Sequence, residues 1–166
     1  MTNPRVFLEL TAADNVKLGK LTIELRKDIV PRTAENFRQL CTGQPGFGYK
    51  NCTFYRVASN FAAVSGDVEQ NNGKGGKSIY GKAFEDENFN LSHNERGVVS
   101  MESSGKANNV NSRFYILFAK ATYLDKKDVV VGKVIDGLGT LQKLEECGSP
   151  DGKPTKTVTI SDCGVA

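Results

Sequence analysis

Apolar and polar residues alternate in many short runs along this chain, which is the pattern of half-buried β-strands. The runs at 6–10 and 20–25 lie on either side of a turn-prone segment at 13–15, and they predict a hairpin with one buried face. Similar runs predict further strands at 53–57, 98–101, 114–118, 129–134 and 157–160. Short strands separated by frequent turns are typical of all-β sandwiches and barrels.

Two segments show helical spacing instead. Residues 31–41 carry apolar side chains three and four positions apart, and Pro31 stands in the first turn, where its missing N–H costs little. Residues 138–147 carry leucines at intervals of three, and Gly148 follows where a left-handed cap would end a helix. Together with about eight strands, these two helices predict a mainly β domain spanning 1–166, built as a barrel with covered ends.

The composition is that of a globular protein, with 166 residues of which 39% are hydrophobic and 25% charged. The net charge of +3 comes from 22 basic and 19 acidic residues spread along the chain, so no basic stripe indicates a nucleic-acid partner. The longest apolar run has six residues, far fewer than the ~20 of a membrane-spanning helix. The first residues lack a secretion signal, and we expect a cytoplasmic, monomeric protein.

Clusters of metal-binding or nucleophilic residues do not stand out. The four cysteines lie far apart without a C-x-x-C pair, so we expect free thiols and neither a metal nor a cofactor. His93 is the single histidine, and its polar neighbours predict a solvent-facing loop instead of a catalytic base. The glycine-rich run at 72–78 lacks the spacing of a phosphate loop, and the acidic run at 85–88 lacks that of a calcium loop.

Several segments resemble the signature runs of the cyclophilins and occur in that family's order. They read VPRTAENFR at 30–38, GFGYK at 46–50, GGKSIYG at 75–81, FEDENF at 84–89 and ISDCG at 160–164. The resemblance covers essentially the whole chain. It implies a closed eight-stranded antiparallel β-barrel capped by two α-helices. It also implies cis/trans isomerisation of the peptide bonds that precede proline, with proline-containing peptides or proteins as partners.

Isomerisation makes a physical demand that single residues can meet. The barrier to peptide rotation is ~18–20 kcal/mol, because resonance gives the C–N bond double-bond character. A catalyst must therefore favour the twisted state, in which the prolyl nitrogen regains a lone pair that a fixed cation can hydrogen-bond. Arg56 matches the family's catalytic arginine. The alternative interpretation is an ordinary surface arginine on a strand.

The resemblance also implies a substrate pocket. Phe61, Tyr115 and Leu124 match the residues of the family's proline pocket, although each could be ordinary barrel packing. Tyr115 adds a hydroxyl where the family usually has phenylalanine, which predicts a more polar pocket floor. Glu102 and Ser103 stand beside the strand that pairs with the substrate backbone in the family, so a carboxylate is expected there.

Departures from the family pattern are concentrated at this pocket. Val64 replaces a glutamine that donates to the substrate carbonyl, and Ala62 replaces a methionine of the pocket wall. Tyr123 replaces the tryptophan associated with cyclosporin binding, and Asp128 replaces a histidine that lines the pocket. Loss of one transition-state donor can reduce a rate by orders of magnitude.

Two hypotheses follow from these departures. The first is a peptidyl-prolyl isomerase with reduced activity and weakened cyclosporin binding. The second is a binding module for proline peptides or proteins, without meaningful catalysis. Lys74 and Lys82 lie on the expected rim of the groove, where they predict a preference for an acidic residue upstream of the ligand proline.

Overall fold

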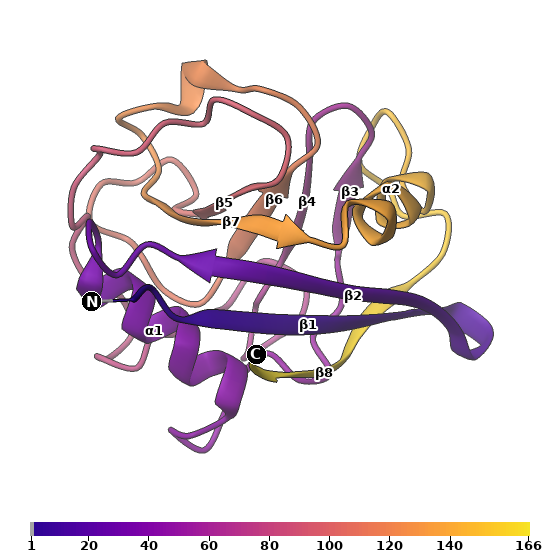
Figure 1. Ribbon diagram of the computed structural model, residues 1–166, viewed down its shortest axis with the longest axis horizontal. Coiled ribbons are helices and arrows are strands. Elements are labelled where there is room, and N and C mark those ends of the chain that lie inside the picture. The colour runs from indigo at the N-terminus through magenta and orange to yellow at the C-terminus, as the bar shows by residue number, and fades with distance from the viewer. Residues whose placement is uncertain (1) are drawn as a thin grey trace.

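The computed structural model describes residues 2–166 and shows a mainly β protein with two α-helices (Figure 1). The strands are β1 (Arg5–Ala12), β2 (Val16–Leu25), β3 (Arg56–Ala58), β4 (Ala62–Ser65), β5 (Val98–Met101), β6 (Phe114–Leu117), β7 (Val130–Asp136) and β8 (Val158–Val165). The helices are α1 (Pro31–Thr42) and α2 (Leu138–Glu146), and short 3-10 turns occupy Ala13–Asn15 and Thr122–Leu124.

The eight strands form one antiparallel sheet in the order β3-β4-β6-β5-β7-β2-β1-β8. The sheet curls into a half-barrel whose two ends are β3 and β8. A closed barrel, which the resemblance implied, is not shown by this strand ladder.

The predicted hairpin is confirmed. β1 and β2 pair from Arg5 opposite Glu24 to Ala12 opposite Val16. The turn between them holds Asp14 at φ 65° and Asn15 at φ 60°. Asp and Asn tolerate this left-handed region better than other non-glycine residues, which is why a polar pair could be recognised as the turn.

One strand begins later than expected. The prediction placed a strand at 53–57, whereas β3 starts at Arg56, because the residues before it pair with β8 instead. The N–H of Phe54 donates to the carbonyl of Val158 at 2.9 Å. The N–H of Asn51 donates to the carbonyl of Ile160 at 2.8 Å. These bonds draw the segment before β3 against the far end of the sheet.

Both predicted helices are present, but the predicted cap of the second is wrong. Gly43, at φ 75°, ends α1 in the left-handed conformation. After α2, Cys147 has a φ of −86° and Gly148 is not in the left-handed region. Gly148 is needed for space, because a Cβ there would lie 2.2 Å from the carbonyl oxygen of Val57.

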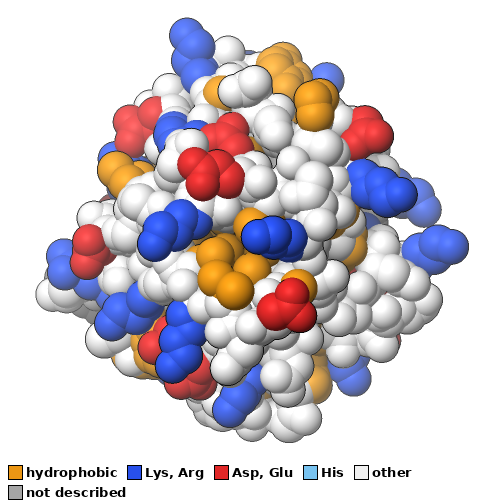
Figure 2. Space-filling view, turned by 90° about the vertical axis from the view of Figure 1, so that its right-hand side faces the viewer, with side chains coloured by type: hydrophobic (Ala, Val, Ile, Leu, Met, Phe, Trp, Pro, Cys, Tyr) orange, Lys and Arg blue, Asp and Glu red, His pale blue; other side chains and the backbone are white. Residues whose placement is uncertain are grey.

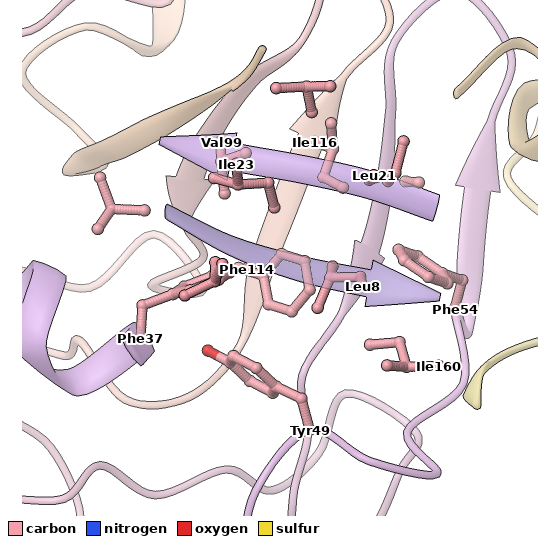
Figure 3. Close-up of a cluster of buried hydrophobic side chains, with 14 of the residues drawn as sticks. Leu8, Leu21, Ile23, Phe37, Tyr49, Phe54, Val99, Phe114, Ile116 and Ile160 are labelled. Carbon is pink, nitrogen blue, oxygen red and sulfur yellow. The ribbon is translucent and has the colours of Figure 1, made fainter. Parts of the chain in front are cut away.

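An aromatic cluster anchors α1 to the sheet (Figure 3). The rings of Phe37 in α1, Tyr49 in the following loop and Phe114 in β6 lie pairwise 5.0 to 5.1 Å apart between centroids. The two contacts of Phe114 are edge-to-face and that of Phe37 with Tyr49 is tilted, and edge-to-face contacts add to the stabilisation from burial. The hydroxyl of Tyr49 donates to the carbonyl of Ser112 at 2.7 Å, so the cluster contains no unpaired phenol.

Charged side chains of both signs are interspersed on the face drawn in Figure 2, around small apolar patches. Within residues 2–166, neither helix has the length and apolar character needed to cross a membrane.

Two glycine substitutions should change stability in opposite directions. We expect Gly148→Ala to lower the free energy of unfolding by about 2 kcal/mol, because the new Cβ would collide with the backbone of Val57. Gly139→Ala in α2 should raise it by about 0.5 kcal/mol, because no atom beyond its chain neighbours and the helix's own backbone lies within 4 Å of the new Cβ and alanine favours the helix. Urea unfolding of both variants measures the difference; equal effects would contradict the steric argument.

Candidate functional site

Three neighbouring strands place candidate site residues in one row. Arg56 in β3 lies opposite Val64 in β4, and Val64 lies opposite Tyr115 in β6. Ser100 in β5 continues the row beyond Tyr115. Directly opposed residues of paired strands point to the same face of a sheet, so these side chains share one surface.

Alternation along β4 and β6 separates this surface from the main core. Ala63 and Ile116 pack into the main core, whereas Ala62, Val64 and Tyr115 belong to a second, smaller apolar cluster. The two-residue period of a strand alone produces this division. The floor of the site therefore consists of the side chains that the core does not use.

A cavity of about 370 Å³, here called the groove, opens over the second cluster. It is lined by Tyr55, Arg56, Phe61, Ala62, Val64, Gly73, Glu102, Ser104, Arg113, Tyr115, Leu124 and Asp128. Eight of the residues expected at the substrate site are among them: Arg56, Phe61, Ala62, Val64, Glu102, Tyr115, Leu124 and Asp128.

Arg56 presents an exposed guanidinium at this groove. Its central carbon lies 5.7 Å from the centroid of the Phe61 ring, within the range of a cation–π contact. Within residues 2–166 the Arg56 side chain makes no ion pair and no hydrogen bond. Its N–H groups therefore remain available to a ligand.

Two predicted residues lie next to the groove without lining it. Ser103 is buried, and its hydroxyl donates to Oδ1 of Asp128 at 2.6 Å. Tyr123 is 64% exposed, and its ring stacks on that of Phe61 with 6.5 Å between centroids.

The two rim lysines differ in their surroundings. The ammonium of Lys82 pairs with Glu69 at 2.5 Å, so its charge is already compensated. Lys74 is exposed and has no ion-pair partner within residues 2–166. Of these two lysines, only Lys74 therefore carries an uncompensated charge that could favour an acidic residue upstream of a ligand proline, as the sequence predicted.

The hydroxyl of Tyr115 is hydrogen-bonded to other protein side chains. It donates to Oδ2 of Asp128 at 2.8 Å and lies 3.1 Å from Nε2 of His93. Burial, and then the charge of Asp128, raise the pKa of Tyr115 well above its usual value. The phenol therefore stays protonated and can keep donating to Asp128.

The prediction of a solvent-facing His93 is wrong. Its side chain is fully buried, with Nδ1 2.8 Å from Oδ1 of Asp125 and Nε2 2.8 Å from Oγ of Ser100. The polar neighbours of His93 in sequence suggested a surface loop, but its partners come from other segments. The imidazole does not line the groove, but it contacts the hydroxyl of Tyr115, which does line it.

In the part of the chain that the structure describes, cysteine and acidic side chains form no candidate metal centre. Within residues 2–166, no three His, Cys, Asp or Glu side chains are grouped so that they could hold a metal ion. The four cysteines are free thiols. Burial, followed by the charge of Asp67, raises the pKa of Cys52 to about 12, so this thiol is protonated at neutral pH.

A comparison with protein-family models decides the family. The model described as "Cyclophilin type peptidyl-prolyl cis-trans isomerase/CLD" matches residues 7–165. The chain belongs to the cyclophilin family. Among curated proteins it is similar to E3 SUMO-protein ligase RanBP2 of Pan troglodytes and of Homo sapiens, each 50% identical over 163 residues. The match covers 98% of this chain but only 5% of either relative's length.

The groove of this cyclophilin contains an ion pair that the sequence did not reveal. Nη1 of Arg113 lies 2.7 Å from Oε2 of Glu102, and the backbone N–H of Glu102 donates to the carbonyl of Arg113 at 3.0 Å. Glu102 was an expected site residue, whereas Arg113 was not. Glu102 follows β5 directly and Arg113 directly precedes β6. Their ion pair can be predicted from the sequence only once these two strands are known to pair.

A buried carboxylate shapes the wall beside this ion pair. Asp67 is 1% exposed and accepts hydrogen bonds from five backbone N–H groups at 2.9 to 3.2 Å, those of Glu69, Gln70, Asn72, Gly73 and Gly75. Burial alone would raise the pKa of Asp67, but backbone hydrogen bonds outweigh it and lower the pKa to about 2. The sequence pattern gives no signal for the role of Asp67, because its five partners belong to a loop without periodic structure.

Asp67→Asn should destabilise this cyclophilin in a pH-dependent way. The pKa of Asp67 falls from 3.8 to about 2 on folding, so its ionisation stabilises the fold fully above 3.8 and stops doing so below about 2. The shift corresponds to about 2 kcal/mol. The difference in unfolding free energy between wild type and variant should shrink by that amount between pH 5 and pH 2, as measured by urea unfolding. A constant difference would contradict this role.

Proposed function

We propose that this cyclophilin accelerates cis/trans isomerisation of X-Pro bonds in peptide or protein substrates, at a rate reduced by its altered groove. Membership of the family supports isomerase activity in general. The observation that carries the proposal is the guanidinium of Arg56, which has no ion-pair partner within residues 2–166 and lies in one row with Val64 and Tyr115 over an apolar cluster.

The proposed chemistry needs a pocket and one cation. The substrate proline packs against the rings of Phe61 and Tyr115 and against Leu124, all of which line the groove. As the peptide bond twists, its nitrogen loses resonance and regains a lone pair. Arg56 donates to that lone pair, which favours the twisted state over the planar ground states. This chemistry requires no nucleophile and no metal.

Reduced activity follows from what surrounds Arg56. Val64 stands between Arg56 and Tyr115 in the row, and its side chain has no hydrogen-bond donor. Ala62 fills less of the groove wall than a longer side chain would. Removing one preorganised transition-state donor typically lowers a rate by ~10²–10³.

A second candidate function is a binding module that holds proline peptides without turnover. The observation that favours it is Val64 itself, because the apolar pocket is retained while a donor is absent from the middle of the row. Binding would then survive and acceleration would not.

The two candidates are separated by exchange spectroscopy on X-Pro peptides with wild type, Arg56→Ala and Val64→Gln. Uncatalysed exchange takes tens to hundreds of seconds, so weak acceleration is measurable. We expect acceleration by wild type, a loss of about 10²-fold in Arg56→Ala and a gain in Val64→Gln. Thermal unfolding of each variant controls for folding. Peptide binding without acceleration would establish the binding module, and neither binding nor acceleration would overturn both candidates.

Cyclosporin should bind weakly to this protein. Tyr123 has a phenol where an indole N–H would be needed, and its ring is stacked on Phe61. Glu102 adds a carboxylate to the groove, and Ala62 removes apolar contact area. We expect Tyr123→Trp to bind cyclosporin at least about tenfold more tightly than wild type, measured by calorimetric titration. Equal affinities would show that position 123 does not limit binding.

A further inference from the structure

Arg113 lies at one end of the groove with its side chain 8% exposed. Its Nη1 donates to the carbonyl of Gly73 at 3.0 Å and to Oγ of Ser104 at 2.8 Å, in addition to Oε2 of Glu102. Its Nε lies 3.4 Å from Oδ1 of Asn111. These contacts fix the guanidinium in one position against the groove wall.

The second terminal nitrogen of Arg113 is unused. Nη2 makes no hydrogen bond within residues 2–166, although a guanidinium offers five N–H donors. In that part of the chain, the only fully buried side-chain nitrogen or oxygen atoms without a partner are Tyr55 Oη and Asp86 Oδ1. Nη2 is therefore not fully buried, and Arg113 is one of the residues that line the groove.

The acceptors in the groove are, by contrast, occupied. Glu102 accepts the N–H of Ser104 at Oε1 and Arg113 at Oε2. Asp128 accepts the hydroxyl of Ser103 at Oδ1 and that of Tyr115 at Oδ2. Within residues 2–166, Arg56 and Nη2 of Arg113 thus keep unused donors on residues that line the groove, while each carboxylate oxygen of Glu102 and Asp128 already has a donor.

Tyr55 also lies at this end of the groove, and its hydroxyl has no partner within residues 2–166. The residue lines the groove, and its ring packs where Gly73 leaves room: a Cβ on Gly73 would lie 2.7 Å from Cε2 of Tyr55. Its hydroxyl is buried and lacks a partner within residues 2–166. Burial, followed by the charge of Glu102, raises the pKa of Tyr55, so the phenol keeps its proton. Because this hydroxyl is itself fully buried, a ligand in the groove does not reach it in this conformation, and the proposal rests on Arg113.

We propose that Arg113 anchors a carboxylate side chain of the substrate, so that this groove prefers proline peptides with an aspartate or glutamate close to the proline. The inference rests on the proposed function, because it assumes that the groove binds proline peptides. A carboxylate is favoured over a neutral acceptor, because its negative charge adds Coulomb attraction to the hydrogen bond from the cationic guanidinium, and this attraction is stronger in a partly desolvated groove than in water. The fixed, planar guanidinium adds geometric selectivity.

Glu102 limits the strength of this preference. The formal charges of Arg56 and Arg113 are cancelled by those of Glu102 and Asp128, and Glu102 directly shares the guanidinium with any incoming carboxylate. Glu102 is thus an internal competitor of the substrate. Removing its charge should strengthen the preference for an acidic peptide, whereas removing the guanidinium should abolish the preference.

The test uses peptides blocked at both ends, so that one side chain carries the only carboxylate. Each peptide contains one proline and either glutamate or glutamine, placed at one of the three positions on either side of the proline. Dissociation constants are measured by NMR titration at low salt, and isomerisation by exchange spectroscopy. The variants are Arg113→Gln and Glu102→Gln. Arg5→Gln and Glu9→Gln on β1, which contributes nothing to the groove, are matched charge controls.

At one position or more, wild type should bind the glutamate peptide about fivefold more tightly than the glutamine peptide. The ratio should fall to about one in Arg113→Gln and rise several-fold in Glu102→Gln, and the controls should keep the wild-type ratio. If Arg113→Gln does not fold, the rise of the glutamate-to-glutamine affinity ratio in Glu102→Gln still tests the role of Arg113.

The failure of this inference can be told from failure of the proposed function. Equal binding of glutamate and glutamine peptides at every position, or a ratio unchanged in Glu102→Gln, overturns the role of Arg113 while proline binding stands. No binding and no acceleration of any peptide overturns the proposed function, and this inference falls with it.

Discussion

The carboxylate of Asp67 is the constraint on which the groove depends. Five backbone N–H groups between Glu69 and Gly75 converge on its two oxygens, so one buried charge fixes the course of a loop that has no regular structure. Gly73 in that loop lines the groove, and its carbonyl holds Arg113. The position of a charged groove residue is thus set by a carboxylate that never reaches the groove. Charge-assisted hydrogen bonds can do this because they are short and strong.

The scaffold and the groove follow different rules. The strands are set by a two-residue period that buries one face, so the hairpin of β1 and β2 and the helices could be predicted from alternation, spacing and turn residues alone. The same period places Val64 and Tyr115 on the groove face, since neighbours such as Ala63 are used by the core. The sequence, together with the resemblance, could therefore predict residues that the fold brings together at the groove, whereas the roles given to them stay a prediction.

What could not be predicted depends on partners distant in sequence. His93 stands among polar residues, but it is buried because Asp125 and Ser100 satisfy both ring nitrogens. Glu102 and Arg113 become partners only through the pairing of β5 with β6. Each case is a polar group whose burial is permitted by a hydrogen bond across the fold, and periodicity carries no information about such bonds.

The two groove arginines are held in ways suited to different tasks. A cation that assists bond rotation must meet a lone pair that exists only in the twisted state, so a permanent carboxylate partner would compete with the reaction. Arg56 meets that condition, because it rests on the Phe61 ring and has no carboxylate partner within residues 2–166. Arg113 is rigidly paired, and a group it binds would be bound equally in the planar and twisted states. Such uniform binding changes KM and leaves kcat unaffected. On the roles proposed for the two arginines, selectivity in this groove can therefore change at Arg113 without disturbing the chemistry proposed at Arg56.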